Sequence, residues 1–554
     1  MQILDNIIDR SGDWNPQVFR ELKERLTSRN IGITATLSLF IQGAVWFGYN
    51  SQIQLSEKTN PYTNETSGDY NNRIHSRYCT EYLKDNYSDV CKFDSSGNFL
   101  NPNWQLWHSD VFICLGWILS IGLILGSVYL LVADLVQEEK RGTLNFIRLS
   151  PQSAQTVFIG KILGVPSLVY LAAASMLPFH LFVGIAAGAS IPLIAGWYLA
   201  IGSMWWLLSS GAVLYVLLGG IQPILTIIAV AYPTALPVFL INQFAAVTIN
   251  HQPWRGEFDR VVQWFWLPVG GNVLLLYGFG IGCCLVMSYG IWQALERRYL
   301  NPTDTVMSKS QSYIANLCFQ VWIAGFALPL MPQRSYDTKA ALVILAGLDF
   351  LALCLLIPLL LPSKQALQDW SRYRRERVNH QQRKFWQREL VQDLMRNDKS
   401  PALLSIAINI GIALVLWVPA SLISFSPISH GVRFIAGLCL GASLILIYAT
   451  IAHWSRFINF KKRNLWTLAI VGGVMFLPSV FAFIISPSSS PTGIAAILLL
   501  FSPFAPVGIL QLSGGTILAT FAAQLLILAG LTRQLQQRLQ ITGQSQSKEL
   551  LANN

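Results

Sequence analysis

A charged island between two long apolar segments holds most of the residues whose types and spacing could do chemistry. It covers residues 137–151 and continues to Gly160 and Lys161. A Gly-Lys pair of this kind could end a phosphate-binding loop, in which backbone amides and the lysine hold a nucleotide. The rest of that motif is absent, because Gln155 stands where its first glycine belongs and Ile162 replaces its serine or threonine. The island is therefore not a nucleotide site.

Other catalytic patterns are also missing from the sequence. There is no Gly-x-Ser-x-Gly nucleophile motif. The seven histidines are dispersed, and none has a second metal ligand at a suitable spacing. We therefore expect no enzymatic activity, no metal site and no cofactor in this chain.

The island instead has features of a surface that binds another protein. Gly142 would permit a bend or the close approach of a neighbour, while Leu144, Ile147 and Arg148 would present a mixed apolar and basic surface to the cytoplasm. Ser150 and Pro151 predict the start of a new helix, because serine caps free amides and proline lacks a donor that the first turn cannot use. An amphipathic connector without a partner is the alternative interpretation.

The composition that surrounds the island indicates a membrane protein. Of 554 residues, 53% are apolar and only 12% are charged, whereas soluble domains carry about 25% charged residues. Apolar runs of about 20 residues recur, which is the length that a helix needs to span a bilayer. The runs are continuous rather than alternating, so they favour helices over a β-barrel. The predicted fold class is all-α, a polytopic helical membrane protein.

The apolar runs predict about twelve transmembrane helices. They cover residues 31–49, 111–136, 162–182, 193–218, 223–247, 273–293, 314–331, 340–361, 403–423, 434–453, 466–485 and 516–531. A broken apolar piece at 493–510 is expected to be re-entrant, because a full crossing, the thirteenth, would place the basic C-terminal tail outside. Weak similarity between the two parts of the chain suggests, as a hypothesis, two degenerate six-helix halves.

Basic residues predict the orientation of the chain in the membrane. Clusters at residues 10–29, 140–161 and 297–309 fall on one side when six spans separate the first from the last. That side is the cytoplasm by the positive-inside rule, and both termini are expected there.

The sequence divides into five parts. These are an amphipathic interfacial helix at 1–30, a six-span domain at 31–300 with an extracytoplasmic loop at 50–108 and the island loop at 137–161, two additional spans at 301–363, a basic cytoplasmic linker at 364–400, and a C-terminal membrane domain at 401–554. An ordinary soluble helix is the alternative for the N-terminus. We expect the linker to be attracted to anionic lipid head groups rather than to nucleic acid. In the external loop we expect a disulfide between Cys79 and Cys91, with two free thiols as the alternative.

Asp349 stands near the middle of the eighth predicted span. A carboxyl group at that depth is costly, so it is a candidate intramembrane polar site. A protonated or hydrogen-bonded structural aspartate is the alternative.

The order and spacing of residues in the island give a further indication. The run Glu138-x-x-x-Gly142-Thr143-Leu144 is followed by Ser150-Pro151 and then by Gly160-Lys161. This pattern, placed after the second span, resembles the first cytoplasmic loop of the permease subunits of type-2 ABC exporters. The resemblance covers about residues 15–300 and includes the N-terminal helix, the long external loop and the six spans. It implies that Glu138, Gly142, Thr143 and Leu144 contribute to docking on a separate ATPase subunit, with Ser150 and Pro151 shaping the turn.

The resemblance implies a permease of an ATP-driven exporter in the plasma membrane of a bacterium, with ATP and magnesium bound by the partner ATPase. A homodimer or a second permease would complete the pathway. Residues 456–463 stand where the loop motif would recur in the second half, and they do not match it. Two alternatives of other classes are an ion- or proton-coupled secondary transporter, with Asp349 as the coupling acid, and a non-transporting membrane scaffold.

Overall fold

The chain forms two compact units. The first comprises residues 1–260 and 268–299, and the second comprises 261–267 and 300–554. The structure, a computed structural model, describes residues 9–10, 12–54, 78, 82–85, 88–91, 102–220, 222–249, 263–331, 336–376, 389–425, 428–458, 463–486, 493–503, 505, 509 and 512–542. The predicted subdivision of residues 301–554 stays a prediction.

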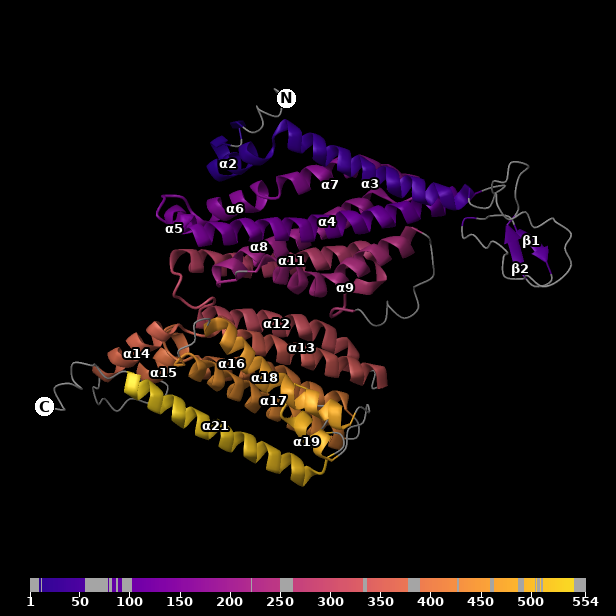
Figure 1. Cartoon of the computed structure of the whole chain (residues 1–554). Coiled ribbons are helices and arrows are strands. Elements are labelled where there is room, and N and C mark those ends of the chain that lie inside the picture. Colours follow the sequence, from indigo (N-terminus) through magenta and orange to yellow (C-terminus); the bar gives the residue numbers. More distant parts are fainter. Residues whose placement is uncertain are drawn as a thin grey trace. The chain divides into compact units, whose positions relative to one another are not determined.

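In its described residues, the first unit consists of helices and one short hairpin (Figure 1). Its elements are α2 (Pro16–Arg25), α3 (Ser28–Gln54), β1 (Tyr82–Asp85), β2 (Ser88–Cys91), α4 (Trp104–Arg141), α5 (Thr143–Arg148), α6 (Ala154–Gly164), α7 (Ser167–Ala186), α8 (Ile191–Leu217), α9 (Pro223–Ile249), the 3₁₀ turn η3 (Val269–Gly271) and α11 (Val273–Leu300). The helix α4 packs against α3, α7, α8 and α9, so it forms the centre of this unit.

The second unit is also helical. Its helices are α12 (Lys309–Leu330), α13 (Tyr336–Leu360), α14 (Lys364–Glu376), α15 (Glu389–Arg396), α16 (Leu403–Ser424), α17 (Ile428–Ser455), α18 (Arg463–Ile485), α19 (Ile494–Leu500) and α21 (Gly514–Thr542). A capping box begins α12: the Gln311 amide donates to Ser308 Oγ, and Gln311 Oε1 accepts from the Ser308 amide. The core of this unit lies among α12, α13, α16 and α17.

Ten helices in the described part of the chain are long and apolar enough to cross a membrane. Two more, α9 and α18, contain the shorter apolar stretches Thr234–Ile249 and Ala469–Ile485. Together they coincide with the predicted spans, which confirms a polytopic helical membrane protein. The helix α19 has seven residues, about 10 Å. It is too short to cross about 30 Å of hydrocarbon by itself. The predicted re-entrant course of residues 493–510 stays a prediction, because only part of this segment is described.

The length of α4 positions the island. Its 38 residues extend about 57 Å, so it is longer than the hydrocarbon layer is thick. Asn103 caps its first turn by accepting from the Leu106 amide at 3.1 Å. Its last two turns carry Asp134 and Glu138, and they bring both carboxylates to the end of the helix from which α5 follows.

The two strands lie in the connection between α3 and α4. They pair antiparallel, with Tyr82 opposite Cys91 and Asp85 opposite Ser88. Cys79 lies outside the described residues, so its disulfide with Cys91 stays a prediction.

Candidate functional site

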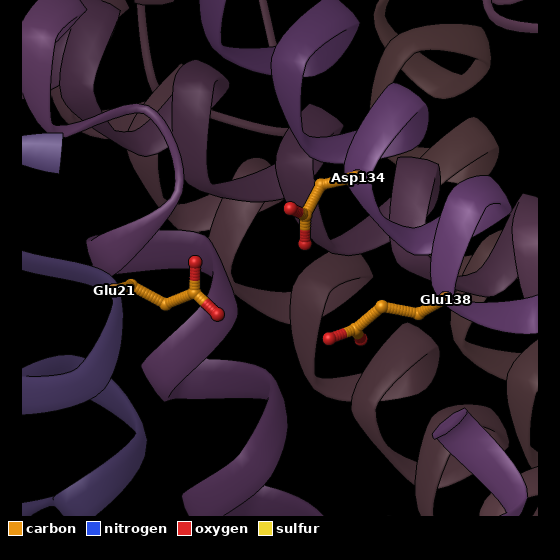
Figure 2. A group of neighbouring side chains, drawn as sticks. All are labelled: Glu21, Asp134 and Glu138. Carbon is orange, nitrogen blue, oxygen red and sulfur yellow. The ribbon is translucent and has the colours of Figure 1, made fainter. Parts of the chain in front are cut away.

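A buried lysine links three helices at the end of α4. Lys161, on α6, is only 1% exposed, and its Nζ donates to Glu21 Oε1 at 2.7 Å. The same nitrogen donates to Asp134 Oδ2 and to Glu138 Oε1, both at 2.8 Å. Glu21 comes from α2, whereas Asp134 and Glu138 are four residues apart on α4 and so share one face. Figure 2 shows the three carboxylates turned toward one another.

Two arginines complete this ion cluster, which we define as Lys161, Arg20, Arg25, Glu21, Asp134 and Glu138. Arg25 Nη2 lies 2.6 Å from Asp134 Oδ1. Arg20 Nη2 lies 3.0 Å from Glu21 Oε1 and 3.1 Å from Glu138 Oε1. Three cations therefore face three anions, and the cluster is balanced in charge.

The positions of the cations argue against a metal ion between the three carboxylates. Their oxygens lie within 4.8 Å of one another, which is close enough to hold an ion. The ammonium of Lys161 is within 2.8 Å of all three carboxylates and occupies the position that a metal would take. The arrangement is an ion-pair network among helices.

Opposite charges in the cluster stabilise the ionised forms of Glu21 and Lys161, although burial alone would favour the neutral forms. Burial by itself raises the pKa of Glu21, but Lys161 and Arg20 lower it more, so the net shift is downward. Burial likewise lowers the pKa of Lys161, but Asp134, Glu21 and Glu138 raise it more, so the net shift is upward. Both groups are charged over the neutral pH range.

Two glycines allow α2 to approach α6 closely. A Cβ at Gly160 would lie 2.5 Å from Gln17 Cβ, and a Cβ at Gly164 would lie 2.5 Å from Glu21 Cβ. The four-residue spacing puts both glycines on one face of α6, as in small-residue helix contacts. Asn15 Nδ2 adds a hydrogen bond to the Thr156 carbonyl at 2.8 Å.

The N-terminal helix therefore differs in part from its predicted form. The predicted amphipathic helix would carry the apolar residues Val18, Phe19, Leu22 and Leu26 on one face. In the structure Val18 is buried together with the polar residues Gln17 and Glu21, and α2 packs on α6 through them.

The island bends at Gly142, as predicted. This residue has φ of +74°, in the left-handed region that favours glycine, and it ends α4 and precedes α5. No described atom lies within 4 Å of the position that a Cβ would take, so the glycine serves the bend and not a close approach. Thr143 Oγ1 donates to the Glu138 carbonyl at 3.1 Å beside it.

The exposed side of α5 is not the one that the sequence indicated. Leu144 was expected to face outward, but it is only 3% exposed. The residues that face outward are Phe146, 77% exposed, and Leu149, 86% exposed. Six helical residues contain too few turns for a sequence pattern to show which side is buried.

The predicted helix start at Ser150 and Pro151 is wrong. The helix α6 begins at Ala154, and its cap is Ser153, whose Oγ accepts from the Thr156 amide at 3.1 Å. Ser150 Oγ instead donates to the Ile147 carbonyl at 2.6 Å and so helps to end α5. Residues 151–153 therefore form the connection between α5 and α6, and Pro151 lies in this connection and not in the first turn of α6.

The inner side of α5 contacts the end of α11. Tyr299 Oη donates to the Ile147 carbonyl at 3.3 Å. The Arg148 guanidinium lies over the Tyr299 ring, 5.8 Å from its centroid. The short helix is thus held between α4 and α11, with Phe146 and Leu149 left exposed.

Sequence reasoning found Glu138 but missed its partners. Lys161 stood out as part of the Gly160-Lys161 pair and not as an ion-pair partner, and neither Glu21 nor Asp134 was predicted to be a site residue. Acids four residues apart near the end of a span, followed by a lysine inside a Gly-x-x-x-Gly run, are the signal that could have found them.

Asp349 lies apart from this cluster, in the second unit. It is 3% exposed and accepts hydrogen bonds from Gln320 Nε2 at 2.6 Å and Trp417 Nε1 at 2.8 Å. It is hydrogen-bonded, as one predicted alternative required.

The fold and the apolar spans define a multi-pass helical membrane protein that associates with the lipid bilayer. No protein-family model, curated protein or solved structure matches the chain.

Proposed function

We propose that this chain is the permease subunit of an ATP-driven ABC exporter and that α5 is the helix on which a separate ATPase subunit docks. The observation that supports this most is a pair of exposed apolar side chains beyond the end of a span: Phe146 on the short helix α5 and Leu149 directly after it. Exposed aromatic side chains of this kind are the usual anchors of protein interfaces.

The surroundings of α5 argue against lipid as its partner. The last turn of α4 carries Glu138, Glu139, Lys140 and Arg141, and such a run of charges does not lie in hydrocarbon. Phe146 and Leu149 follow these charges in the chain. A protein surface is therefore the partner that would cover them.

The ion cluster gives the proposed docking helix a mechanical role. It joins the end of α4 to α6, which leads into α7, and to α2, which leads into α3. A displacement of α5 by the ATPase would therefore be shared by three spans. In this proposal Glu138 acts by positioning the loop, because its carboxylate is engaged by Lys161 and Arg20.

Co-purification tests the docking proposal. The tagged chain, extracted from native membranes in mild detergent, is expected to recover an ATPase with nucleotide-binding motifs, identified by mass spectrometry. Phe146→Asp and Leu149→Asp should lower that recovery at least about tenfold, because each removes an apolar anchor.

Asn145→Asp is the matched control, since it adds the same charge to an exposed position of the same helix. Equal recovery with all three variants would contradict the role of α5. Recovery of no ATPase by the unaltered chain, together with transport that ignores ATP depletion but stops when ion gradients collapse, would favour a secondary transporter instead.

A further inference from the structure

The second unit contains a chain of buried polar side chains that ends at Asp349. It crosses three helices: Asn316 and Gln320 come from α12, Asn409 and Trp417 from α16, and Asp349 from α13. Asp349 stands ten residues into the apolar stretch Ala340–Leu360. This row of hydrogen-bonded side chains therefore ends near the middle of a membrane span.

The direction of each hydrogen bond in this chain is determined by a backbone carbonyl. The Asn409 carbonyl can only accept, so the Asn316 amide nitrogen must face it, and that distance is 2.9 Å. Asn316 Oδ1 then faces Gln320 and accepts from its Nε2 at 3.1 Å. The same nitrogen of Gln320 is left facing Asp349 Oδ1 at 2.6 Å.

Both oxygens of Asp349 are consequently acceptors. Gln320 presents an N–H to Oδ1, and the indole of Trp417 can only donate, so Oδ2 accepts as well. Two donors directed at one carboxyl group favour its ionised form. The polarity of the network thus suits a carboxylate anion.

No side chain balances this negative charge among the residues that the structure describes. The helix α13 packs against α12, α16 and α17. From α12 Asp349 faces Gln320, from α16 it faces Trp417, and the lining residues on α17 are Gly437, Leu438, Gly441, Ala442 and Ile445. None of these is ionisable, and a lone buried charge is strongly unfavourable. The ion cluster of the first unit, by contrast, is balanced.

A cavity adjoins the carboxylate. It has a volume of about 60 Å³ and is lined by residues of α13, α16 and α17 and by Ser502, Pro503 and Ala505. A single water needs roughly 10–15 Å³ on this measure, so the cavity has room for on the order of four.

We propose that this cavity binds a small monovalent cation, with the Asp349 carboxylate supplying the charge. Water in the cavity supplies further oxygen ligands. One carboxylate balances a single positive charge, whereas calcium and magnesium sites usually combine several hard oxygen ligands, carboxylates among them. The ion is either a sodium ion or a proton that the carboxylate and its water carry. Each of these ions has one positive charge. The site goes beyond the proposed permease function and does not depend on an ATPase partner.

Equilibrium binding of radioactive sodium to the full-length purified chain is the first test. We expect saturable binding with a stoichiometry of about one per chain and a rise in thermal midpoint in sodium chloride relative to choline chloride. Asp349→Asn should weaken the binding at least about tenfold, because it removes the charge.

A second variant separates binding from folding. Gly347 lines the cavity but is itself exposed, and open space surrounds the position of its Cβ, so Gly347→Leu should obstruct the opening of the cavity and leave the hydrogen-bonded network intact. Gly411→Leu is its matched control, since Gly411 is an exposed glycine in the neighbouring helix α16 with the same open space and does not line the cavity. Sodium binding should be lost with the first and kept with the second.

An infrared measurement identifies the ion if sodium does not bind. A carboxylic-acid band that appears on acidification, and is absent in Asp349→Asn, would assign the site to a proton. Absence of both sodium binding and this band would overturn the proposal, as would sodium binding that Asp349→Asn and Gly347→Leu leave unchanged. A failure to recover an ATPase would contradict the docking proposal for α5 in the first unit and would leave the cation-site proposal for the second unit unaffected.

Discussion

Lys161 Nζ lies 2.7 Å from Glu21 Oε1, although 140 residues separate the two in the chain. The contact ties the N-terminal helix α2 to α6, and Asp134 and Glu138 extend it to α4. Removal of one member leaves the others buried without a balancing charge, so the cluster can be tested one residue at a time.

Replacement of Lys161 is expected to destabilise the first unit. Lys161→Met would leave Glu21, Asp134 and Glu138 facing one another, at a cost of about 3 kcal/mol in the free energy of unfolding. Unfolding in mixed detergent micelles measures the change. Lys140→Met, at an exposed position near the end of α4, should change it by less than about 0.5 kcal/mol.

The pair can also be tested for coupling. Glu21→Gln combined with Lys161→Met should cost less than the sum of the two single changes, because the double variant removes opposite charges together. Strictly additive losses would contradict a direct interaction between Lys161 and Glu21.

The two glycines of α6 are expected to tolerate no side chain. Gly160→Ala and Gly164→Ala would each place a Cβ 2.5 Å from a side-chain carbon of α2, and such overpacking costs about 1–3 kcal/mol. Hydrogen exchange of the α2 amides should accelerate at least about tenfold. Gly122→Ala, which meets nothing within 4 Å on α4, is the control and should leave α2 unchanged.

The bend at Gly142 is expected to depend on backbone conformation alone. Gly142→Ala should destabilise the turn by about 1 kcal/mol, because a left-handed conformation strains a residue with a Cβ. Gly142→Asn should cost less, since asparagine tolerates that conformation. Amide exchange over residues 143–149 measures both. An equal effect of the two variants would show that side-chain size, not φ, limits this position.

Stability of the first unit should fall in acid and stay level at neutral pH. The pKa of Glu21 is lowered from its ordinary value of 4.5, so its contribution is complete above about 4.5 and is lost as pH falls through the folded value. The pKa of Lys161 is raised from 10.5, so its contribution is complete below that value and is lost only at higher pH. The contribution of the Lys161–Glu21 pair is therefore level over about pH 5–10.

Glu21→Gln provides the check on this assignment. Thermal midpoints measured across the pH range should show a shallower acid decline for that variant than for the unaltered chain. An unchanged acid decline would place its origin in other carboxyl groups.

The spans could be predicted from the sequence because the membrane requires long apolar helices, and that requirement is visible locally. The bend at Gly142 was also visible, since glycine adopts positive φ readily. The outward side of α5 was not, because Leu144 and Phe146 differ only in what the rest of the unit packs against them. The ion cluster was missed for a related reason: Glu21 and Lys161 meet only when α2 lies on the glycine face of α6.

The charge balance of the ion cluster has an electrical consequence. A group with three positive and three negative charges that moves as one body does almost no work against a membrane potential. The work done on each positive charge is cancelled by the work done on a negative charge. The carboxylate of Asp349 differs in this respect, since one elementary charge carried through the full potential exchanges about 2.3 kcal/mol per 100 mV. A membrane potential would therefore change how often an ion occupies the cavity of the second unit. It would leave the ion cluster of the first unit unaffected.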